Sequence, residues 1–394
     1  MEKFLSYDTI GRVLFYAGKI MSRKRQNIIF FSVIFLLFFA VFVCNYFLNN
    51  SFEQYNINKS TSRDLVFTNI KRSHKYSYDK IVMGTSTTFS MYDGPKINVP
   101  RIIVYSMSYK EFYEYMTAFF DVHKETKTMY FPLELHSILY NQNKNGGEDK
   151  NTPKYDHHCE MTFDDFVRLY FNFDVMKEKI ESQKAEIASI FHKGEKEKAL
   201  NYNDEYRLIY PKTRIMREKT VSPEFVEENK YYIGKIIDFL KENNIKTICY
   251  IPPYNYIYLQ VALSGDNMQI FNDVKKFILS KGVDIYDFSK KNRYNTEKMT
   301  ETYLFDDLIH PNDLYGKMAI DILEHKTDNK ELYGLITPQN VEEYNKNFEK
   351  ELNEYREQYK SYIAEYNTYN CDVSSDDHKF IRVVPESEIP SEYK

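Results

Sequence analysis

A serine and a histidine that lie far apart in the chain have the neighbours that serine-dependent chemistry requires. Ser86 follows Gly84 and Thr85, directly after an apolar run of strand character. The glycine allows a sharp turn, so the serine hydroxyl can stand just beyond the end of the strand. Backbone N–H groups at the start of a following helix can then stabilise a developing oxyanion. Alone, Gly-x-Ser after a strand is a weak indication, because it occurs by chance in many proteins.

The second group of residues is Asp307 and His310, which lie three positions apart and directly before Pro311. A carboxylate at this spacing can hold the imidazole in the tautomer that accepts the proton of a serine hydroxyl. Taken alone, a capping aspartate and a surface histidine explain the same residues. Together with Ser86 they predict a catalytic triad of Ser86, His310 and Asp307, with Asp306 as the alternative to Asp307.

The rest of the sequence predicts an α/β fold, a parallel sheet between helices, because short β-rich runs alternate with helical stretches. The expected strands are residues 80–83, 101–107, 128–135, 246–251 and 284–288. The expected helices are residues 109–123, 223–243, 267–281 and 312–325. In this arrangement Ser86 follows the first strand, and His310 precedes the last helix that covers the sheet.

Three segments fall outside the alternating pattern. Residues 139–221 are an insertion between the third and fourth strands; insertions of this length are often lids or partner surfaces, and a surface excursion without a role is the alternative. Residues 337–370 carry an apolar or tyrosine side chain every three or four positions, which predicts one long amphipathic helix. We expect this helix to dock on its own domain; pairing as a coiled coil and an aromatic face for sugars are the alternatives. Residues 371–394 are polar and are expected to be a disordered tail.

An apolar segment near the N-terminus predicts a membrane anchor. Residues 28–48 contain no charged side chain and provide about the 20 residues with which a helix crosses about 30 Å of hydrocarbon. The length of the segment argues against a buried soluble helix. A cleaved signal peptide is disfavoured because Asn45, Tyr46 and Phe47 stand where small residues would form the cleavage site.

The charges around this segment predict its orientation. Basic residues precede it at Lys19, Arg23, Lys24 and Arg25. By the positive-inside rule, residues 1–27 lie in the cytoplasm and the main domain lies outside the cytoplasmic membrane. We expect residues 49–74 to be a stalk and residues 75–336 to be the α/β domain.

Composition argues against several other classes of site. The four cysteines are scattered, without a Cys-x-x-Cys pair, so neither a zinc site nor a disulfide framework is suggested. No residue pattern suggests another metal or a cofactor. The formal net charge of -4 gives no sign of polyanion binding, so nucleic acid is not an expected partner.

The motif residues resemble a known family. Gly84-Thr85-Ser86 and Asp307-x-x-His310 resemble the first and last blocks of the SGNH (GDSL-like) hydrolases. Residues 101–111 and 127–135 are similar to a membrane-anchored branch of that family found in bacterial surface-polymer loci. This branch includes the teichoic acid D-alanylation protein and exopolysaccharide O-acetyltransferases. The resemblance covers about residues 75–325 and implies a flavodoxin-like sheet, Ser86 as nucleophile, His310 as general base and Asp307 as the group that orients it.

The chain departs from the family pattern at the oxyanion hole. It has no Gly-x-Asn-Asp block, which in ordinary members supplies an oxyanion-hole asparagine; the anchored branch often lacks that block too. The remaining candidates are the backbone N–H groups of Ser86 and Ser106 and the side chain of Asn255.

This resemblance implies extracytoplasmic acyl transfer, with O-acetylation of a cell-surface polysaccharide as the leading hypothesis. The implied partner is a multispanning membrane acyltransferase that exports the acyl group. A carbohydrate esterase or deacetylase and a D-alanyl transferase acting on teichoic acid would use the same residues. A noncatalytic assembly factor of surface-polymer synthesis and a polysaccharide-binding module are the alternatives from other classes.

Overall fold

The computed structural model shows where these residues lie in the folded chain. It describes residues 23–49, 55–58, 63–92, 99–105, 107–139, 160–171, 223–263, 265–296, 304–305 and 309–358. The chain divides into two compact units, one formed by Met1–Phe52 with Thr162–Ala188 and the other by Glu53–Met161 with Ser189–Lys394. All of the sheet and all of the predicted site residues belong to the second unit.

The first unit contains helices α2 (Arg23–Asn49) and α7 (Phe163–Phe171). They pack through aromatic rings, with the Phe42 ring centroid 5.6 Å from those of Tyr170 and Phe171. The predicted anchor at residues 28–48 falls within α2. Among the helices of the described ranges, none is both long enough and apolar enough to cross a membrane, so the predicted transmembrane helix is not supported.

The second unit is built on a seven-stranded sheet with the order β1-β3-β2-β4-β5-β6-β7. The strands are β1 (Asn56–Asn58), β2 (Lys80–Gly84), β3 (Arg101–Ile103), β4 (Thr128–Pro132), β5 (Lys246–Ile251), β6 (Ile285–Asp287) and β7 (Gly334–Ile336). Neighbouring strands are parallel except for β7, which pairs antiparallel with β6. The predicted mixed α/β class and largely parallel sheet are confirmed, whereas the two edge strands were not predicted.

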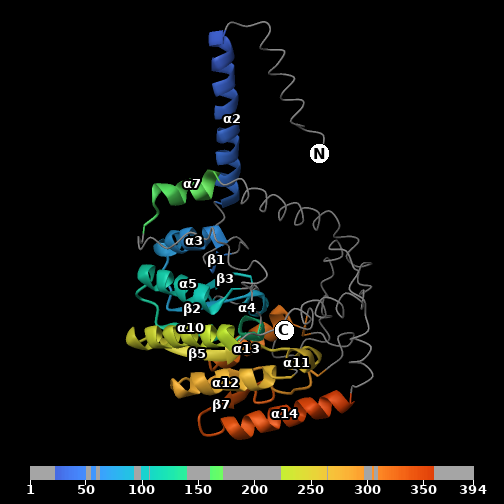
Figure 1. Ribbon diagram of the computed structural model, residues 1–394. Coiled ribbons are helices and arrows are strands. Elements are labelled where there is room, and N and C mark those ends of the chain that lie inside the picture. The colour runs from blue at the N-terminus through green and yellow to red at the C-terminus, as the bar shows by residue number, and fades with distance from the viewer. Residues whose placement is uncertain are drawn as a thin grey trace. The chain divides into compact units, whose positions relative to one another are not determined.

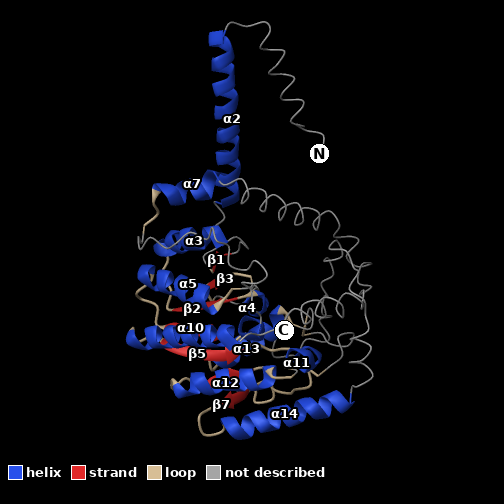
Figure 2. Cartoon of the chain, viewed as in Figure 1, coloured by secondary structure: helices blue, strands red, loops and turns tan. Residues whose placement is uncertain are grey.

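Helices cover the sheet on both faces (Figures 1 and 2). They are α3 (Val66–Arg72), α4 (Ser86–Tyr92), α5 (Tyr109–Val122), α6 (Leu135–Leu139), α10 (Pro223–Glu242), α11 (Tyr256–Ala262), α12 (Asn267–Ser280), α13 (Asp313–Leu323) and α14 (Val341–Gln358). The chain moves from β2 to β3 in one direction and from β3 to β4 in the other. With right-handed crossovers, this reversal puts α4 and α5 on opposite faces. Helix α10 contacts both α5 and α12, whereas α4 packs against α13.

The structure differs from the predicted stalk at residues 49–74. Strand β1 pairs with β3 at the edge of the sheet, and α3 is buried over almost its whole length. Ile57, Val66 and Ile70 are each exposed by 1% or less. These apolar side chains complete the core, so the described part of this segment belongs to the α/β unit rather than to a solvated connection.

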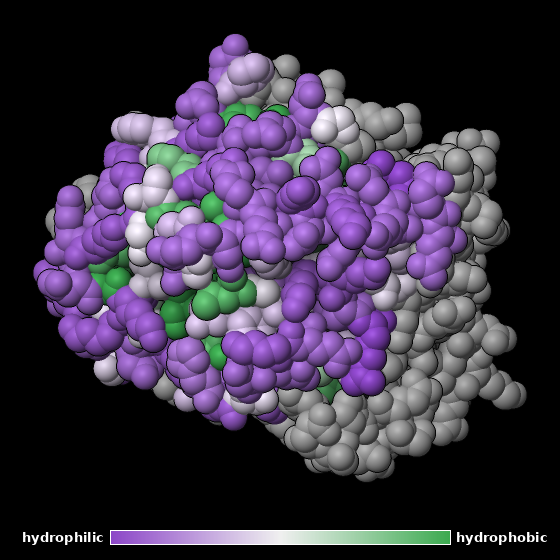
Figure 3. Space-filling view, turned by 90° about the horizontal axis from the view of Figure 1, so that it is seen from below, coloured by the Kyte–Doolittle hydropathy of each residue, from purple (hydrophilic) through white to green (hydrophobic). Residues whose placement is uncertain are grey.

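The predicted amphipathic helix docks on its own unit where the structure describes it, as α14. Its apolar positions Val341, Phe348, Leu352 and Tyr355 are buried. Figure 3 views the molecule from below, the side on which Figure 1 draws α14, and the coloured surface there is mostly hydrophilic. The last part of the predicted helix, residues 359–370, and the predicted tail at residues 371–394 lie outside the described residues.

A buried lysine lies where α14 meets α12. Lys275 is 0% exposed, and its Nζ donates a hydrogen bond of 2.6 Å to Oδ1 of Asn345. The same Nζ lies 4.9 Å and 5.5 Å from the ring centroids of Phe271 and Phe348. Burial lowers the pKa of Lys275 to about 8, and the attraction of Asp287 opposes that shift. The folded state therefore binds this proton less tightly than the unfolded chain does.

This difference predicts a pH dependence of stability that belongs to Lys275. Between its folded pKa of about 8 and the unfolded value near 10.4, the unfolded chain holds more protons, so the free energy of unfolding rises with pH. We expect a gain of about 1 kcal/mol from pH 7 to pH 9, measured by urea denaturation as the difference between wild type and Lys275→Met. Lys276→Met, which removes the neighbouring lysine paired with Glu342, is the matched control and should keep the wild-type slope. An unchanged slope in Lys275→Met would contradict the assignment.

Candidate functional site

Ser86 and His310 meet at the carboxyl-terminal edge of the sheet. Ser86 Oγ lies 3.0 Å from His310 Nε2, although the two residues are 224 positions apart in the chain. Both side chains are partly exposed. Ser86 is the first residue of α4 and is separated from the end of β2 by Thr85 alone, and His310 lies just before α13. A hydroxyl that donates to an imidazole nitrogen at this distance can be activated as a nucleophile by general-base catalysis.

The packing of α4 against α13 brings this pair together. Gly316 in α13 lies against the backbone of Met91 in α4, and a Cβ at position 316 would lie 2.2 Å from the Met91 carbonyl oxygen. Any larger residue would therefore force the helices apart. The start of α13 is fixed by Asn312, whose Oδ1 accepts a hydrogen bond of 3.1 Å from the Tyr315 N–H. His310 therefore lies just before the start of α13, which Asn312 caps.

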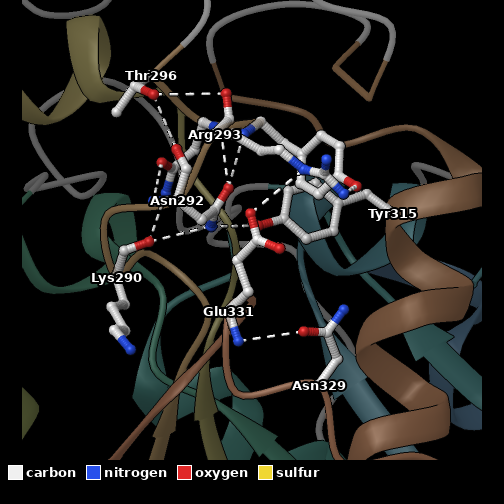
Figure 4. Close-up of polar contacts among 9 residues, drawn as sticks. Lys290, Asn292, Arg293, Thr296, Tyr315, Asn329 and Glu331 are labelled. Carbon is white, nitrogen blue, oxygen red and sulfur yellow. Dashed lines mark hydrogen bonds and ion pairs between the residues drawn. The ribbon is translucent and has the colours of Figure 1, made fainter.

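The loop that follows β6 also contacts α13 (Figure 4). The Asn292 side-chain amide donates 3.0 Å to the Tyr315 hydroxyl. The Asn292 Oδ1 accepts from the backbone N–H groups of Tyr294 and Asn295, at 2.9 Å and 3.1 Å, and so fixes the shape of its own loop. The hydrogen bond between Asn292 and Tyr315 thus joins the loop after β6 to the first turn of α13.

A buried carboxylate that the sequence analysis did not single out lies beneath the nucleophile turn. Glu134, in the loop after β4, is 3% exposed. Its Oε1 accepts hydrogen bonds from the Thr85 N–H (3.1 Å) and from the hydroxyls of Thr85 (2.9 Å), Thr87 (2.5 Å) and Thr88 (2.9 Å). Burial raises the pKa of Glu134, and the bonds from Thr87, Thr85 and Thr88 oppose that rise. A sequence signal did exist, since three threonines flank Ser86 and a glutamate stands next to last in the third predicted strand.

His136 holds the same turn from the other side of Thr85. Its Nε2 lies 2.8 Å from the Thr85 hydroxyl oxygen. The single hydroxyl proton of Thr85 is donated to Glu134, so the His136 Nε2 carries a proton and donates to Thr85. His136 is 1% exposed, so it supports the turn from inside and does not meet solvent.

Gly84 has a packing role in addition to the sharp turn predicted for it. A Cβ at position 84 would lie 2.3 Å from the Thr88 Oγ1. The first turn of α4 therefore folds back directly over the end of β2, which keeps Thr88 within reach of Glu134.

The other predicted site residues have different outcomes. Asp307, its alternative Asp306 and Ser106 lie outside the described residues. Asn255 is fully buried, and its Oδ1 accepts 2.9 Å from the Ile257 N–H in the first turn of α11. This gives Asn255 a local capping role, and its place in an oxyanion hole stays a prediction.

The backbone next to position 106 is held by an arginine. Arg63 Nη2 donates 3.1 Å to the Tyr105 carbonyl oxygen, and Arg63 Nε lies 2.5 Å from Glu111 Oε1. The other carboxylate oxygen of Glu111 accepts 2.9 Å from the Ser108 N–H at the start of α5. The segment after β3 is thereby fixed on both sides of position 106.

A second serine–histidine contact shows that distance alone does not define a site. Ser73 Oγ lies 2.6 Å from His123 Nε2, and Glu125 Oε1 lies 3.3 Å from His123 Nδ1. Ser73 is 0% and His123 1% exposed, so no substrate can reach them. The Ser73 hydroxyl also donates 2.6 Å to the Ile70 carbonyl oxygen. This group links the end of α3 to the start of β4, at the opposite edge of the sheet from Ser86.

Other chemistry is not assembled in the described part of the chain. Within those ranges, no cluster of three or more histidine, cysteine, aspartate or glutamate side chains could hold a metal ion. Cys249 in β5 is fully buried, and burial raises the pKa of its thiol, so it stays protonated.

Comparisons of the chain with models of protein families, with curated proteins and with solved structures find no match. The functional assignment therefore depends on the geometry around Ser86.

The contact between α4 and α13 predicts that Gly316→Ala disturbs the Ser86–His310 pair. The added methyl should destabilise the fold by about 1–3 kcal/mol and move His310 relative to Ser86. Because a displacement of about 1 Å can cost about 100-fold in rate, we expect at least about 10-fold slower labelling of Ser86 by a fluorophosphonate. Labelling is followed by mass spectrometry of the folded protein.

Gly234→Ala in α10 is the matched control for Gly316→Ala. At position 234 a Cβ would meet the end of the Phe277 side chain at 3.2 Å, which can move aside. This variant should label at the wild-type rate. Equal labelling rates for the two glycine variants would show that the α4–α13 contact does not set the Ser86–His310 distance.

Proposed function

We propose that this protein is a serine-dependent acyl-transfer enzyme of the SGNH type, with Ser86 as nucleophile and His310 as general base. The observation that supports this most directly is the 3.0 Å contact between Ser86 Oγ and His310 Nε2 in a partly exposed position. The order of strands β3-β2-β4-β5-β6 also supports it. Numbered from β2, this order is 2-1-3-4-5, the flavodoxin-like order, in which ligands bind at the carboxyl ends of the strands where the order reverses. Ser86 follows β2 at that point.

The proposed reaction has two half-reactions. Ser86 Oγ attacks the carbonyl carbon of an acyl donor while the hydroxyl proton of Ser86 passes to His310 Nε2. The tetrahedral intermediate then expels the donor's leaving group, which takes that proton from His310. The acyl group now forms an ester with Ser86. An acceptor hydroxyl then gives its proton to His310 Nε2 while its oxygen attacks the carbonyl carbon of that ester. The tetrahedral intermediate expels Ser86 Oγ, which takes the proton from His310 and is again a hydroxyl. Asp307 is proposed to accept the His310 Nδ1–H and hold the required tautomer.

We further propose that the acceptor is a hydroxyl of a bacterial cell-surface polysaccharide and that the acyl group is acetyl. This part rests on the resemblance of residues 75–325 to the anchored SGNH branch. The same resemblance and the apolar segment at residues 28–48 are the reasons to propose a position outside the cytoplasmic membrane and a multispanning acyltransferase as partner. If water replaces the sugar hydroxyl as acceptor, the same site is a carbohydrate esterase.

The proposal predicts that a chromogenic acetyl ester is hydrolysed by the full chain in a Ser86-dependent way. Ser86→Ala and His310→Ala should each lower kcat/KM by about 10⁴-fold or more, because each removes a group that acts only with the other. The double variant should be no slower than the single ones. If Ser86→Ala hydrolysed the ester as fast as wild type, the catalytic role of Ser86 would be wrong.

Ser73→Ala is the matched control. It removes a serine that also contacts a histidine, at 2.6 Å, but in a buried position. Turnover per folded molecule should equal that of wild type. A loss of turnover as large as that of Ser86→Ala would show that the proposed activity does not belong specifically to Ser86 and His310.

The choice between transfer and hydrolysis is tested by adding acceptor sugars to the acetyl-ester reaction. Transfer predicts that an O-acetylated oligosaccharide forms at the expense of free acetate, as measured by mass spectrometry. Release of acetate alone, with Ser86 still required, would identify an esterase.

A further inference from the structure

We propose that Glu134 is a positioning residue that fixes the Ser86 hydroxyl for attack. The inference rests on the proposed role of Ser86 as nucleophile. Glu134 itself is buried and does not reach the reacting atoms; it acts through the three threonines beside Ser86.

The hydrogen bonds to Glu134 fix the chain on both sides of Ser86. Thr85 donates through both its N–H and its hydroxyl, and Thr87 and Thr88 donate through their hydroxyls. Ser86 is the one residue of this turn whose hydroxyl contacts His310 instead. Its neighbours thus face the interior while its own side chain faces the imidazole. The backbone torsions that aim Ser86 are therefore set by contacts of residues 85, 87 and 88.

The four donors require an ionised carboxylate. Glu134 Oε1 accepts all four bonds, and only an anionic oxygen gains charge-assisted stabilisation from so many donors. A glutamine at this position would offer a neutral carbonyl oxygen, and its amide group would add donors to a site that is already rich in donors. Replacement of the carboxylate by an amide therefore loosens the turn without changing its volume.

The ionised form of Glu134 is disfavoured by its burial in the fold. A role in stabilising the fold therefore does not account for this carboxylate, whereas a role in positioning Ser86 does. Burial raises the pKa of Glu134, so the folded environment disfavours its anionic form. Glu324 shows the opposite case at the other end of β2. Lys80, the first residue of β2, and Lys326 both form ion pairs with Glu324, and although burial acts to raise the pKa of Glu324, these lysines hold it below its usual value. The surroundings of Glu324 favour its ionised form, whereas those of Glu134, beside the proposed nucleophile, disfavour it.

The two glutamates predict opposite outcomes of the same substitution. Glu134→Gln should lower kcat for ester hydrolysis by about 100-fold with KM within about 3-fold of wild type, because orientation rather than binding is lost. Its melting temperature should stay close to that of wild type, because removal of a disfavoured buried charge and loss of the charge-assisted hydrogen bonds oppose each other. Glu324→Gln leaves two lysines without their carboxylate, so it should lower the melting temperature and leave kcat unchanged.

A second variant and a second measurement keep the test independent of folding and of turnover. Thr88→Val removes one of the four donors and should lower kcat several-fold, in the same direction as Glu134→Gln. Amide hydrogen exchange at residues 85–88 should accelerate in Glu134→Gln but not in Glu324→Gln, whether or not the protein turns over the ester.

The outcomes separate the inference from the proposed function. Wild-type kcat in Glu134→Gln, while Ser86→Ala is inactive, would overturn the positioning role and leave the nucleophile in place. A fall in kcat that only follows a fall in melting temperature would also overturn it, because a purely structural role predicts that. Ester hydrolysis unaffected by Ser86→Ala would instead overturn the proposed function, and faster exchange at residues 85–88 would then report only that Glu134 holds the turn.

Discussion

The close approach of two helix backbones is the constraint on which the candidate site depends. Gly316 lets α13 lie directly against Met91 of α4. Ser86 opens α4 and His310 stands just before α13, so the distance between their reactive atoms follows from how these two helices pack. Helix packing in a dense core has little freedom to adjust. The Ser86–His310 distance is therefore tied to the packing of the interior, although both residues lie at the edge of the sheet.

Charged groups are used differently at the two ends of β2. At its first residue, Lys80 pairs with Glu324, and nearby His123 contacts both Ser73 and Glu125 in a buried group. These contacts join elements of the fold. At the other end of the strand, Glu134 is surrounded by threonine hydroxyls and Ser86 remains partly exposed. The contrast between the two serines shows that solvent access, rather than a short contact with histidine, distinguishes a candidate nucleophile from a structural serine.

Much of the fold was predictable because it is recorded in local patterns. Strand β5 has the expected bounds, and β2 differs only by the inclusion of Gly84. The edge strands β1 and β7 were missed although β3 and β6, which also have three residues each, were predicted. Strands β3 and β6 lie in the longer strand-like runs at residues 101–107 and 284–288, whereas β1 contains a single apolar residue between asparagines and β7 is bounded by Gly334 and Thr337. The stalk was misjudged because the burial of Val66 and Ile70 depends on α5, which lies more than thirty residues further along the chain. The meeting of Ser86 and His310 was predictable from their motifs. Glu134 was not singled out, because the three threonines and the glutamate become one group only once β4 is known to lie beside β2.

The long separation of Ser86 and His310 along the chain has a consequence for biosynthesis. A ribosome completes β2, β4 and the turn that Glu134 holds well before it adds the imidazole, which is encoded 224 positions after the serine. Contacts between such distant segments also form slowly, because the chain loses the entropy of closing a long loop before the stabilising contacts exist. An incomplete chain that ends before position 310 therefore contains Ser86 without the imidazole that contacts it. Under the proposed function, the capacity for acyl transfer therefore arises only after synthesis has passed His310, which follows β6 in the chain.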